Sequence, residues 1–492
     1  MEVRGSVIVG DITDPQFRNK KRSSWAHQRL VYHNGVPTMQ LAMDEAHGKN
    51  QLPTSDDIPR IAVKGFRKSA KLWSLFSLFN KFGTVTYVGV SEQFAVVEFE
   101  DRNVVEKILP LTHLRHEDSV IKVEPLSYFP HAVPEQMEFY LQDEITSAFA
   151  STRSLENYID DLCMGARLES NPERDLAVCR VLETSLQSLY PDCKAHPFGS
   201  RVSGLGLPHC DLDVFCDTGD MYDGNSEQDP LSQEILVTST CKILSKDKDF
   251  NHLHAVPKAR VPILRFLHVP STTFCDVAFR HGMGVENTKL LVFLLSLDPR
   301  LHPLCIFVKK WAHLQEFRAA HKMGHFSSYA LVMMVVFFFQ QLPEPILPPI
   351  YLLQAKHTGP RHYIAGWDCT FTTDKSKVPA TSNTQTVLEL LEEFCKFYRS
   401  FDYDNFVICP LLGSRIEKTD FQGSMTNLQP FMSRYRQLIS DGEATKFPVK
   451  CPISVQDPLD LSHNLTRPVK YDHLMKFIST CGLTQSLCGK LH

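Results

Sequence analysis

The sequence predicts an α+β protein in which a sheet carries a polar site and a helical region follows it along the chain. Three observations predict this class. Short alternating segments between residues 193 and 280 have the two-residue period of strands, and apolar patterns after residue 285 have the period of helices. Residues 59–125 show the order strand, helix, strand, strand, helix, strand, which indicates a separate small domain. A chain of 492 residues is long enough for two or three domains.

The composition is that of an ordinary globular protein. Hydrophobic residues make up 43% and charged residues 22%, and the formal net charge is −4, so any contact with nucleic acid must come from local basic surface. The 14 cysteines include no Cys-x-x-Cys pair and no zinc-ligand spacing, which favours reduced thiols inside a cell. The most apolar run, residues 329–339, is too short to span a bilayer, so we expect no membrane partner.

Two segments flank the small domain. Residues 1–57 lack sustained periodicity, so we expect them to be mostly irregular. Their basic cluster is either a nuclear import signal or an ordinary solvated surface; it consists of Arg18, Lys20, Lys21 and Arg22. Residues 127–140 contain prolines and no pattern, and are expected to be a linker.

Between these segments, residues 58–126 resemble an RNA-recognition motif, whose ferredoxin-like sheet stacks bases on aromatic side chains. The expected elements are strands at 61–66, 85–90 and 94–99 and a helix at 72–82. Phe94 and Phe99 fit the motif, whereas Ala62 and Val96 stand where stacking residues belong. RNA contact and a protein–protein or scaffolding role therefore both remain open, and a homodimer through this domain is one form of the second.

One strand of the central sheet carries two carboxylates. Residues 211–215 alternate polar and apolar side chains, so Asp211 and Asp213 point to the same face. Carboxylates at that spacing repel each other unless a cation lies between them, and oxygen ligands of this kind suit Mg²⁺. The alternative is a strand whose acids are merely solvated.

A Gly-Ser turn precedes this pair. Gly199 and Ser200 open an expected short helix after a strand, where backbone N–H groups can approach a phosphate. Two longer helices are expected upstream, at 141–167 and 172–189, and Asn171 is the expected N-cap of the second. Residues 141–282 are thus expected to form one catalytic domain with a phosphate site beside a metal-binding pair.

This unit resembles the nucleotidyltransferases of the DNA polymerase β superfamily, and more closely the noncanonical poly(A) polymerases and terminal uridylyltransferases. That family has a third metal-binding aspartate on a later strand, and Asp276 in the expected strand 273–279 matches it. The resemblance implies that Asp211, Asp213 and Asp276 are catalytic and bind metal, with Mg²⁺ or Mn²⁺ as cofactor. It also implies two-metal transfer of a nucleotide from UTP or ATP to an RNA 3′ end.

Residues 283–475 resemble the helical PAP-associated domain of the same family. Lys309 matches an apolar-Lys-x-Trp-Ala pattern whose lysine contacts nucleotide phosphates; the alternative is a surface lysine that only snorkels. Asn287 matches the contact to the ribose hydroxyl, or is an ordinary asparagine at a helix start. Ser328 and Tyr329 lie in a Ser-Ser-Tyr pattern, where the serine suits phosphate and the tyrosine either stacks on a base or packs in the core.

A loop near the end of this region bears on the choice of nucleotide. Residues 456–464 resemble the family's loop over the nucleobase, and His463 stands where the uridylyltransferases have a histidine. An imidazole N–H can donate to the O4 carbonyl of uracil, whereas adenine presents an amino donor at the matching edge. UMP addition is therefore favoured, and AMP addition with His463 only bracing the loop is the alternative. Residues 476–492 are expected to be a C-terminal tail.

Two further interpretations of the function stay open, a mitochondrial-type poly(A) polymerase and a catalytically inactive scaffold in RNA processing. The subgroups with a similar N-terminal domain are the mitochondrial poly(A) polymerases and the nuclear, speckle-targeted enzymes that uridylate a small nuclear RNA. The expected location is therefore the nucleus or cytoplasm, with the mitochondrion as the alternative. The expected partners are an RNA 3′ end and UTP or ATP.

Overall fold

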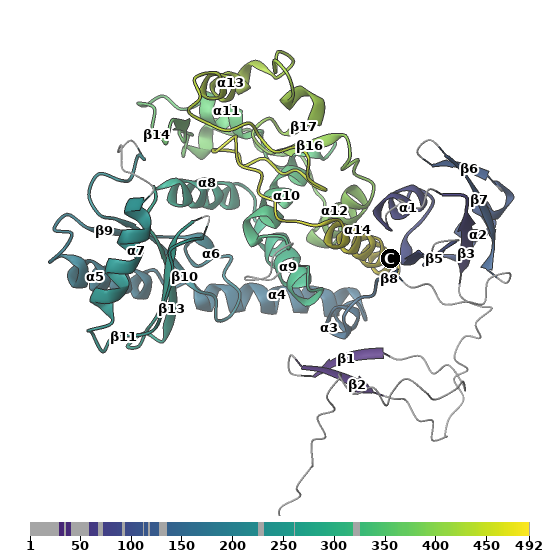
Figure 1. Cartoon of the computed structure of the whole chain (residues 1–492), viewed down its shortest axis with the longest axis horizontal. Coiled ribbons are helices and arrows are strands. Elements are labelled where there is room, and N and C mark those ends of the chain that lie inside the picture. Colours follow the sequence, from purple (N-terminus) through teal and green to yellow (C-terminus); the bar gives the residue numbers. More distant parts are fainter. Residues whose placement is uncertain are drawn as a thin grey trace, which may run out of the picture. The chain divides into compact units, whose positions relative to one another are not determined.

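The computed structural model describes residues 29–33, 36–40, 59–66, 72–90, 94–111, 113–116, 119–126, 135–224, 231–259, 261–317 and 325–491. They divide into two units, residues 1–58 and 59–492. In the first unit, β1 (Arg29–His33) and β2 (Val36–Gln40) form an antiparallel hairpin within the segment expected to be mostly irregular (Figure 1). Strands this short leave little periodic signal in the sequence. The basic cluster at 18–22 lies outside the described residues.

The second unit begins with an antiparallel six-stranded sheet in the order β6-β7-β3-β5-β4-β8. Its strands are β3 (Arg60–Lys64), β4 (Val85–Val90), β5 (Ala95–Phe99), β6 (His113–His116), β7 (Ser119–Pro125) and β8 (Glu135–Glu138). Helices α1 (Leu72–Phe79) and α2 (Arg102–Ile108) share one apolar core with this sheet. The strand expected at 85–90 is confirmed, while β8 was not predicted because it falls in the expected linker, where it pairs with the edge strand β4.

The central sheet has five strands in the order β11-β12-β13-β10-β9. They are β9 (Lys194–Phe198), β10 (Leu212–Asp217), β11 (Phe250–Val256), β12 (Ile263–His268) and β13 (Thr273–Ala278). Only the β10–β13 pair of this sheet is parallel. Helices α5 (Pro172–Leu186) and α7 (Leu231–Leu244) lie beside the sheet (Figure 1), and α5 shares a buried apolar cluster with it. Asn171 caps α5 as expected, because its side chain accepts from the Arg174 N–H.

The remaining helices build the region beside this sheet. They are α3 (Asp143–Ala148), α4 (Thr152–Glu169), α8 (Met283–Leu297), α9 (Leu301–Leu314), α10 (Ser328–Gln341), α11 (Ile350–Ala355), α12 (Val387–Arg399), α13 (Ser433–Ser440) and α14 (Tyr471–Cys488). Two short hairpins, β14 (Tyr363–Ile364) with β15 (Trp367–Asp368) and β16 (Phe406–Cys409) with β17 (Ser414–Glu417), complete it. Helix α10 is buried along nearly its whole length. In the part of the chain that the structure describes, no helix has the length and apolarity to cross a membrane.

The segment expected to be a C-terminal tail is instead most of α14. Its buried residues are Leu474, Met475, Phe477, Ile478 and Cys481, together with several small residues. The helix packs on α12, and it also contacts α1 and β4 of the N-terminal sheet. The Ser479 hydroxyl donates to the Val85 carbonyl, and the rings of Tyr471 and Trp73 lie 5.2 Å apart. The tail prediction was therefore wrong, because this apolar surface is buried between two neighbours.

Adding a methyl group at Gly482 should loosen the contact between α14 and the N-terminal sheet. A Cβ there would stand 2.4 Å from Thr84 Oγ1 and 2.6 Å from its Cγ2. We expect Gly482→Ala to lower the free energy of unfolding by about 1–3 kcal/mol, as overpacking does, although alanine is the better helix former. Gly489→Ala is the control, since its Cβ would lie 3.8 Å or more from the nearest atoms. Urea unfolding of both variants checks this, and equal stabilities would contradict it.

Candidate active site

The register of the central sheet brings the predicted aspartates together. Asp211 directly precedes β10, and Asp213 lies within it, directly opposite Asp276 on the parallel strand β13. Burial, reinforced by the charges of Asp276 and Asp211, raises the pKa of Asp213 to about 7. The three carboxylates thus form a strongly negative site at one end of β10.

Gly199 places a backbone turn directly against this site. It opens the short helix α6 (Gly199–Val202) with a φ of +82°, a conformation that favours glycine. A Cβ at this position would stand 2.2 Å from Asp213 Oδ2, so no larger residue fits without movement. The Gly199 N–H donates to Thr288 Oγ1 on α8 at 2.9 Å, and Ser200 follows it, half-buried. The structure therefore brings Gly199 and Ser200 to the acids, but the Gly199 N–H is already engaged.

A buried ion pair anchors α6. Nη2 of Arg201 donates to Asp175 Oδ1 on α5 at 2.8 Å, and Nη1 donates to both Glu169 Oε2 and the Cys210 carbonyl. A buried arginine needs such partners, because an unpaired charge away from water is costly. This pairing fixes the turn at Gly199 relative to the helices behind the sheet.

The sequence-based site set missed Arg265, which lies among the acids. Arg265 lies directly opposite Asp276 where β12 pairs with β13 in antiparallel fashion. The guanidinium makes a two-pronged contact with that carboxylate, Nε to Oδ1 at 2.7 Å and Nη2 to Oδ2 at 2.5 Å, and Nη2 also lies 3.3 Å from Asp211 Oδ2. A short turn separates the alternating segment that holds Arg265 from the expected strand 273–279. Working out their register would have placed Arg265 opposite Asp276.

The donor chemistry of the three acids fits a divalent cation, since carboxylate oxygens are the ligands that Mg²⁺ and Mn²⁺ take. The raised pKa of Asp213 reflects burial and negative charge that a cation would relieve. Across the described ranges, however, no three or more His, Cys, Asp or Glu side chains form a group that would hold a metal ion. Both oxygens of Asp276 instead contact Arg265.

Helix α8 joins the acid site to a second group of predicted residues. Next to Thr288, which binds Gly199, the Asn287 side chain donates from Nδ2 to Asp457 Oδ2 at 3.1 Å. Its Oδ1 is buried and makes no hydrogen bond. Asp457 belongs to the loop 456–464 and also lies 3.8 Å from Nδ1 of His463. Asp457 lies within the predicted loop but was not expected as a site residue.

Tyr329 faces the same group from the first turn of α10. Its hydroxyl is buried without a hydrogen-bond partner, and burial, with the charge of Asp457 adding to it, raises the pKa of Tyr329 well above its ordinary value. Ser327 rather than Ser328 caps this helix, accepting from the Ala330 N–H at 3.1 Å. Asn464 holds the loop in place, with Oδ1 accepting from two backbone N–H groups and Nδ2 donating to the Pro448 carbonyl.

Lys309 lies in the interior on α9, with its ammonium near the α6 turn. It is only 2% exposed, so the alternative of a snorkelling surface lysine is wrong. Its ammonium donates to the carbonyl of Leu205, just after α6, and its charge lowers the pKa of Asp213. The structure therefore places Lys309 beneath the turn that carries Gly199 and Ser200.

Residues 155–295 match the family model described as "Poly(A) RNA polymerase, mitochondrial-like, central palm domain", a range that contains all three aspartates. The chain is 26% identical to the speckle targeted PIP5K1A-regulated poly(A) polymerase of Danio rerio, over 93% of this chain and 63% of that protein. It is 27% identical to terminal uridylyltransferase 7 of Homo sapiens, over 63% of this chain and 19% of that protein. The chain thus spans less than two thirds of the length of either relative.

Residues 155–295 are thus similar to the palm domain of the poly(A) polymerases, and the chain as a whole is similar to a poly(A) polymerase and to a terminal uridylyltransferase. Its fold is also similar to that of a solved family member, mtPAP in complex with UTP, with a TM-score of 0.58 and 20% identity. That match covers 86% of this chain and 90% of the other. The expected resemblance to these enzymes and a mixed α/β fold similar to that of mtPAP are therefore confirmed.

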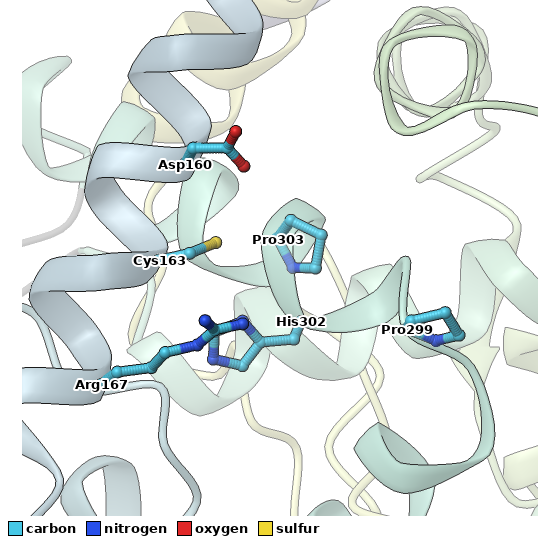
Figure 2. A pocket seen from close by; sticks show the side chains of 6 residues that line it. All are labelled: Asp160, Cys163, Arg167, Pro299, His302 and Pro303. Carbon is cyan, nitrogen blue, oxygen red and sulfur yellow. The ribbon is translucent and has the colours of Figure 1, made fainter.

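A pocket of about 340 Å³ lies away from the aspartates, at the surface between α4 and α9. Figure 2 shows Asp160, Cys163 and Arg167 on α4 and, across from them, His302 and Pro303 on α9, with Pro299 at the margin. None of the residues expected to bind metal or nucleotide lines it. The pocket is therefore not part of the candidate active site.

Proposed function

We propose that this chain is a template-independent nucleotidyltransferase that adds UMP, or alternatively AMP, to RNA 3′ ends. The observation that carries the proposal is the register of Asp213 opposite Asp276, with Asp211 adjacent and the Gly199 turn packed on Asp213. This arrangement joins a set of metal-ligand oxygens to a backbone turn suited to phosphate, and it lies within the palm domain that matches the family.

In this proposal Asp211, Asp213 and Asp276 hold two Mg²⁺ or Mn²⁺ ions. The chemistry that divalent ions supply when bound there is charge neutralisation at the triphosphate and a lower pKa for the RNA 3′-hydroxyl. The protein's own part is to orient the reactants. Gly199 brings the α6 backbone and Ser200 next to the acids, so that one triphosphate would contact both.

Lys309 and Ser328 have less direct parts in the proposal. The ammonium of Lys309 supports the Leu205 carbonyl, so it stabilises the phosphate turn from below and adds positive charge near the acids. Ser328 lies half-buried in the first turn of α10, where backbone N–H groups favour negative charge. Lys309 and the start of α10 at Ser328 would attract the triphosphate mainly through the positive electrostatic potential that they create.

The nucleoside would lie against Asn287, Tyr329 and His463. Two buried polar atoms here, Asn287 Oδ1 and the Tyr329 hydroxyl, make no hydrogen bond, and buried polar groups without partners are rare in folded proteins. A ribose hydroxyl is a suitable donor for Asn287 Oδ1, and the ring of Tyr329 offers a face for the base. These unsatisfied atoms support a ligand at this position.

His463 supports uracil as the preferred base. The loop is braced by the backbone of His463, whose N–H donates to the Asp460 carbonyl and whose carbonyl accepts from the Asp457 N–H. Its imidazole is one third exposed, and at 3.8 Å it is too far from Asp457 for a normal hydrogen bond. A ring N–H is therefore able to donate to O4 of uracil. The 3.8 Å approach of the imidazole to Asp457 supports the opposing hypothesis, in which His463 braces the loop.

Replacing His463 should shift the nucleotide preference. With a labelled oligoribonucleotide and each NTP separately, we expect the wild type to favour UTP over ATP in kcat/KM by about tenfold to a hundredfold, since an unpaired polar group costs about 1–3 kcal/mol. His463→Leu should move the ratio toward ATP. His113→Leu, at an exposed position on β6, should leave it unchanged.

Three other outcomes have distinct meanings. A wild type that prefers ATP, with a ratio unchanged in His463→Leu, would support a mitochondrial-type poly(A) polymerase. No incorporation of any nucleotide would support the inactive scaffold. Extension that is equal with all four NTPs would exclude base selection by His463.

The N-terminal sheet is part of the proposal as a ferredoxin-like, RNA-recognition-type domain. The order β7-β3-β5-β4 within it supports this assignment. On the face that would stack bases, Ala62 is fully buried and Arg60 pairs with Glu98 at 2.6 Å, which favours a scaffolding role, including a homodimer, over base stacking. Relatives named for nuclear speckles and for mitochondria support the nucleus or the mitochondrion as the location.

A further inference from the structure

We propose that Arg265 is a positioning residue that competes with the metal for Asp276, so that metal binding and release of the Arg265–Asp276 pair are a single exchange. The inference deepens the proposed function and rests on it, because the exchange matters only if the three aspartates bind divalent ions. It concerns how this chain assembles its metal site before nucleotide and RNA arrive.

The contact between Arg265 and Asp276 is specific in geometry. The two residues are direct neighbours across the β12–β13 ladder, and each carboxylate oxygen accepts from a different guanidinium nitrogen, at 2.7 and 2.5 Å. This fork-to-fork pairing is the strongest form of arginine–carboxylate contact. It uses both oxygens of the one carboxylate that the site needs as its third ligand.

The same guanidinium also neutralises the carboxylate charge that a bound metal ion would neutralise. Its Nη2 lies 3.3 Å from Asp211 Oδ2, so one positive group lies between two of the three acids. A guanidinium and a divalent cation both relieve the repulsion among the carboxylates, and they need the same oxygens. In agreement with this, the described residues contain no group of three His, Cys, Asp or Glu side chains arranged to hold a metal.

Arg265 also has room to leave. Its side chain is 26% exposed, so the guanidinium can turn toward water once Asp276 binds a cation. Arginine keeps its charge at every physiological pH, so protonation does not release it. A cation that takes over the carboxylates is the event that breaks the pair.

The test measures the affinity of the full chain for Mn²⁺ without nucleotide or RNA. Titration calorimetry and the electron paramagnetic resonance signal of free Mn²⁺ are the two readouts. Arg265→Gln removes the competing charge, and we expect it to bind Mn²⁺ about threefold to tenfold more tightly than the wild type. Arg60→Gln is the matched control, because it breaks a similar arginine–carboxylate pair, with Glu98, outside the site. Its Mn²⁺ affinity should equal that of the wild type.

Equal or weaker Mn²⁺ binding by a folded Arg265→Gln variant would overturn the inference. If that variant does not fold by circular dichroism, Arg265→Lys carries the test, since lysine keeps the charge but loses the fork. We then expect Arg265→Lys to bind Mn²⁺ more tightly than the wild type does, and equal or weaker Mn²⁺ binding overturns the inference. Asp276→Asn should weaken binding, and an Asp276→Asn variant that binds like the wild type would contradict the proposed metal site itself.

Discussion

Replacing Asp213 with asparagine should lower kcat/KM for RNA 3′-end extension by about a thousandfold or more, because a lost metal ligand removes several kcal/mol of charge stabilisation. The fold should survive. Asp213 carries a pKa of about 7 in its buried, negatively charged surroundings, so a neutral amide of the same shape relieves repulsion. We expect the free energy of unfolding to stay within about 1 kcal/mol of the wild type, or to rise.

Asp217→Ala is the control for this prediction, since the two acids share strand β10. Asp217 is buried and accepts from the N–H groups of Gly219 and Met221 at 3.0 and 2.9 Å. Losing both bonds should cost about 1–3 kcal/mol of stability while the folded molecules keep most of their activity. Primer extension and urea unfolding measure the two effects. An Asp213→Asn enzyme with more than about a tenth of wild-type kcat/KM would exclude a direct role in the chemistry.

Gly199→Ala should lower kcat/KM by about a hundredfold or more, because small displacements at a reacting centre have effects of this size. The new Cβ would stand 2.2 Å from Oδ2 and 3.0 Å from Cγ of Asp213, so the turn or the carboxylate must move. The φ of +82° adds backbone strain of about 1–2 kcal/mol for any residue with a Cβ.

Gly442→Ala separates these two causes. Gly442 has nearly the same φ, +77°, but a Cβ there would meet nothing within 4 Å. Its alanine variant should therefore show the strain in its unfolding free energy without a loss of kcat/KM. If both variants keep full activity, the α6 turn is not tied to the position of Asp213, and the proposed phosphate site loses its main support.

Much of this site follows from local patterns in the sequence. The two-residue period of β10 placed Asp211 and Asp213 on one face, and the strand at 273–278 brought Asp276 directly opposite Asp213. Gly199 was expected to open a turn, and the structure adds the reason that only glycine fits there. Periodicity shows the features that depend on neighbours in the chain, whereas the resemblance to the family implied the role of Asp276.

The features that were missed depend on tertiary contacts. Arg265 enters the site only through the register of β12 with β13, and Asp457 only because Asn287 reaches it across 170 residues of sequence. One alternative for Lys309 was a snorkelling surface lysine, but α9 is buried on most of its surface and the ammonium donates to a backbone carbonyl instead. Helical spacing alone does not show which faces of a helix the rest of the protein covers.

The docking of α14 also affects the order in which this protein acquires its structure during synthesis. Ser479 and its acceptor, the Val85 carbonyl, are 394 residues apart in sequence. At about 5–20 residues per second, a ribosome needs about 20–80 seconds to cover that distance. Throughout that interval the N-terminal sheet lacks the helix that packs on it, and its contact surface, including Trp73 and Thr84, is open to chaperones. The same surface is open to α14 of a neighbouring chain whose synthesis is finished. Dimers in which two chains exchange α14 would therefore form where many ribosomes translate one messenger RNA.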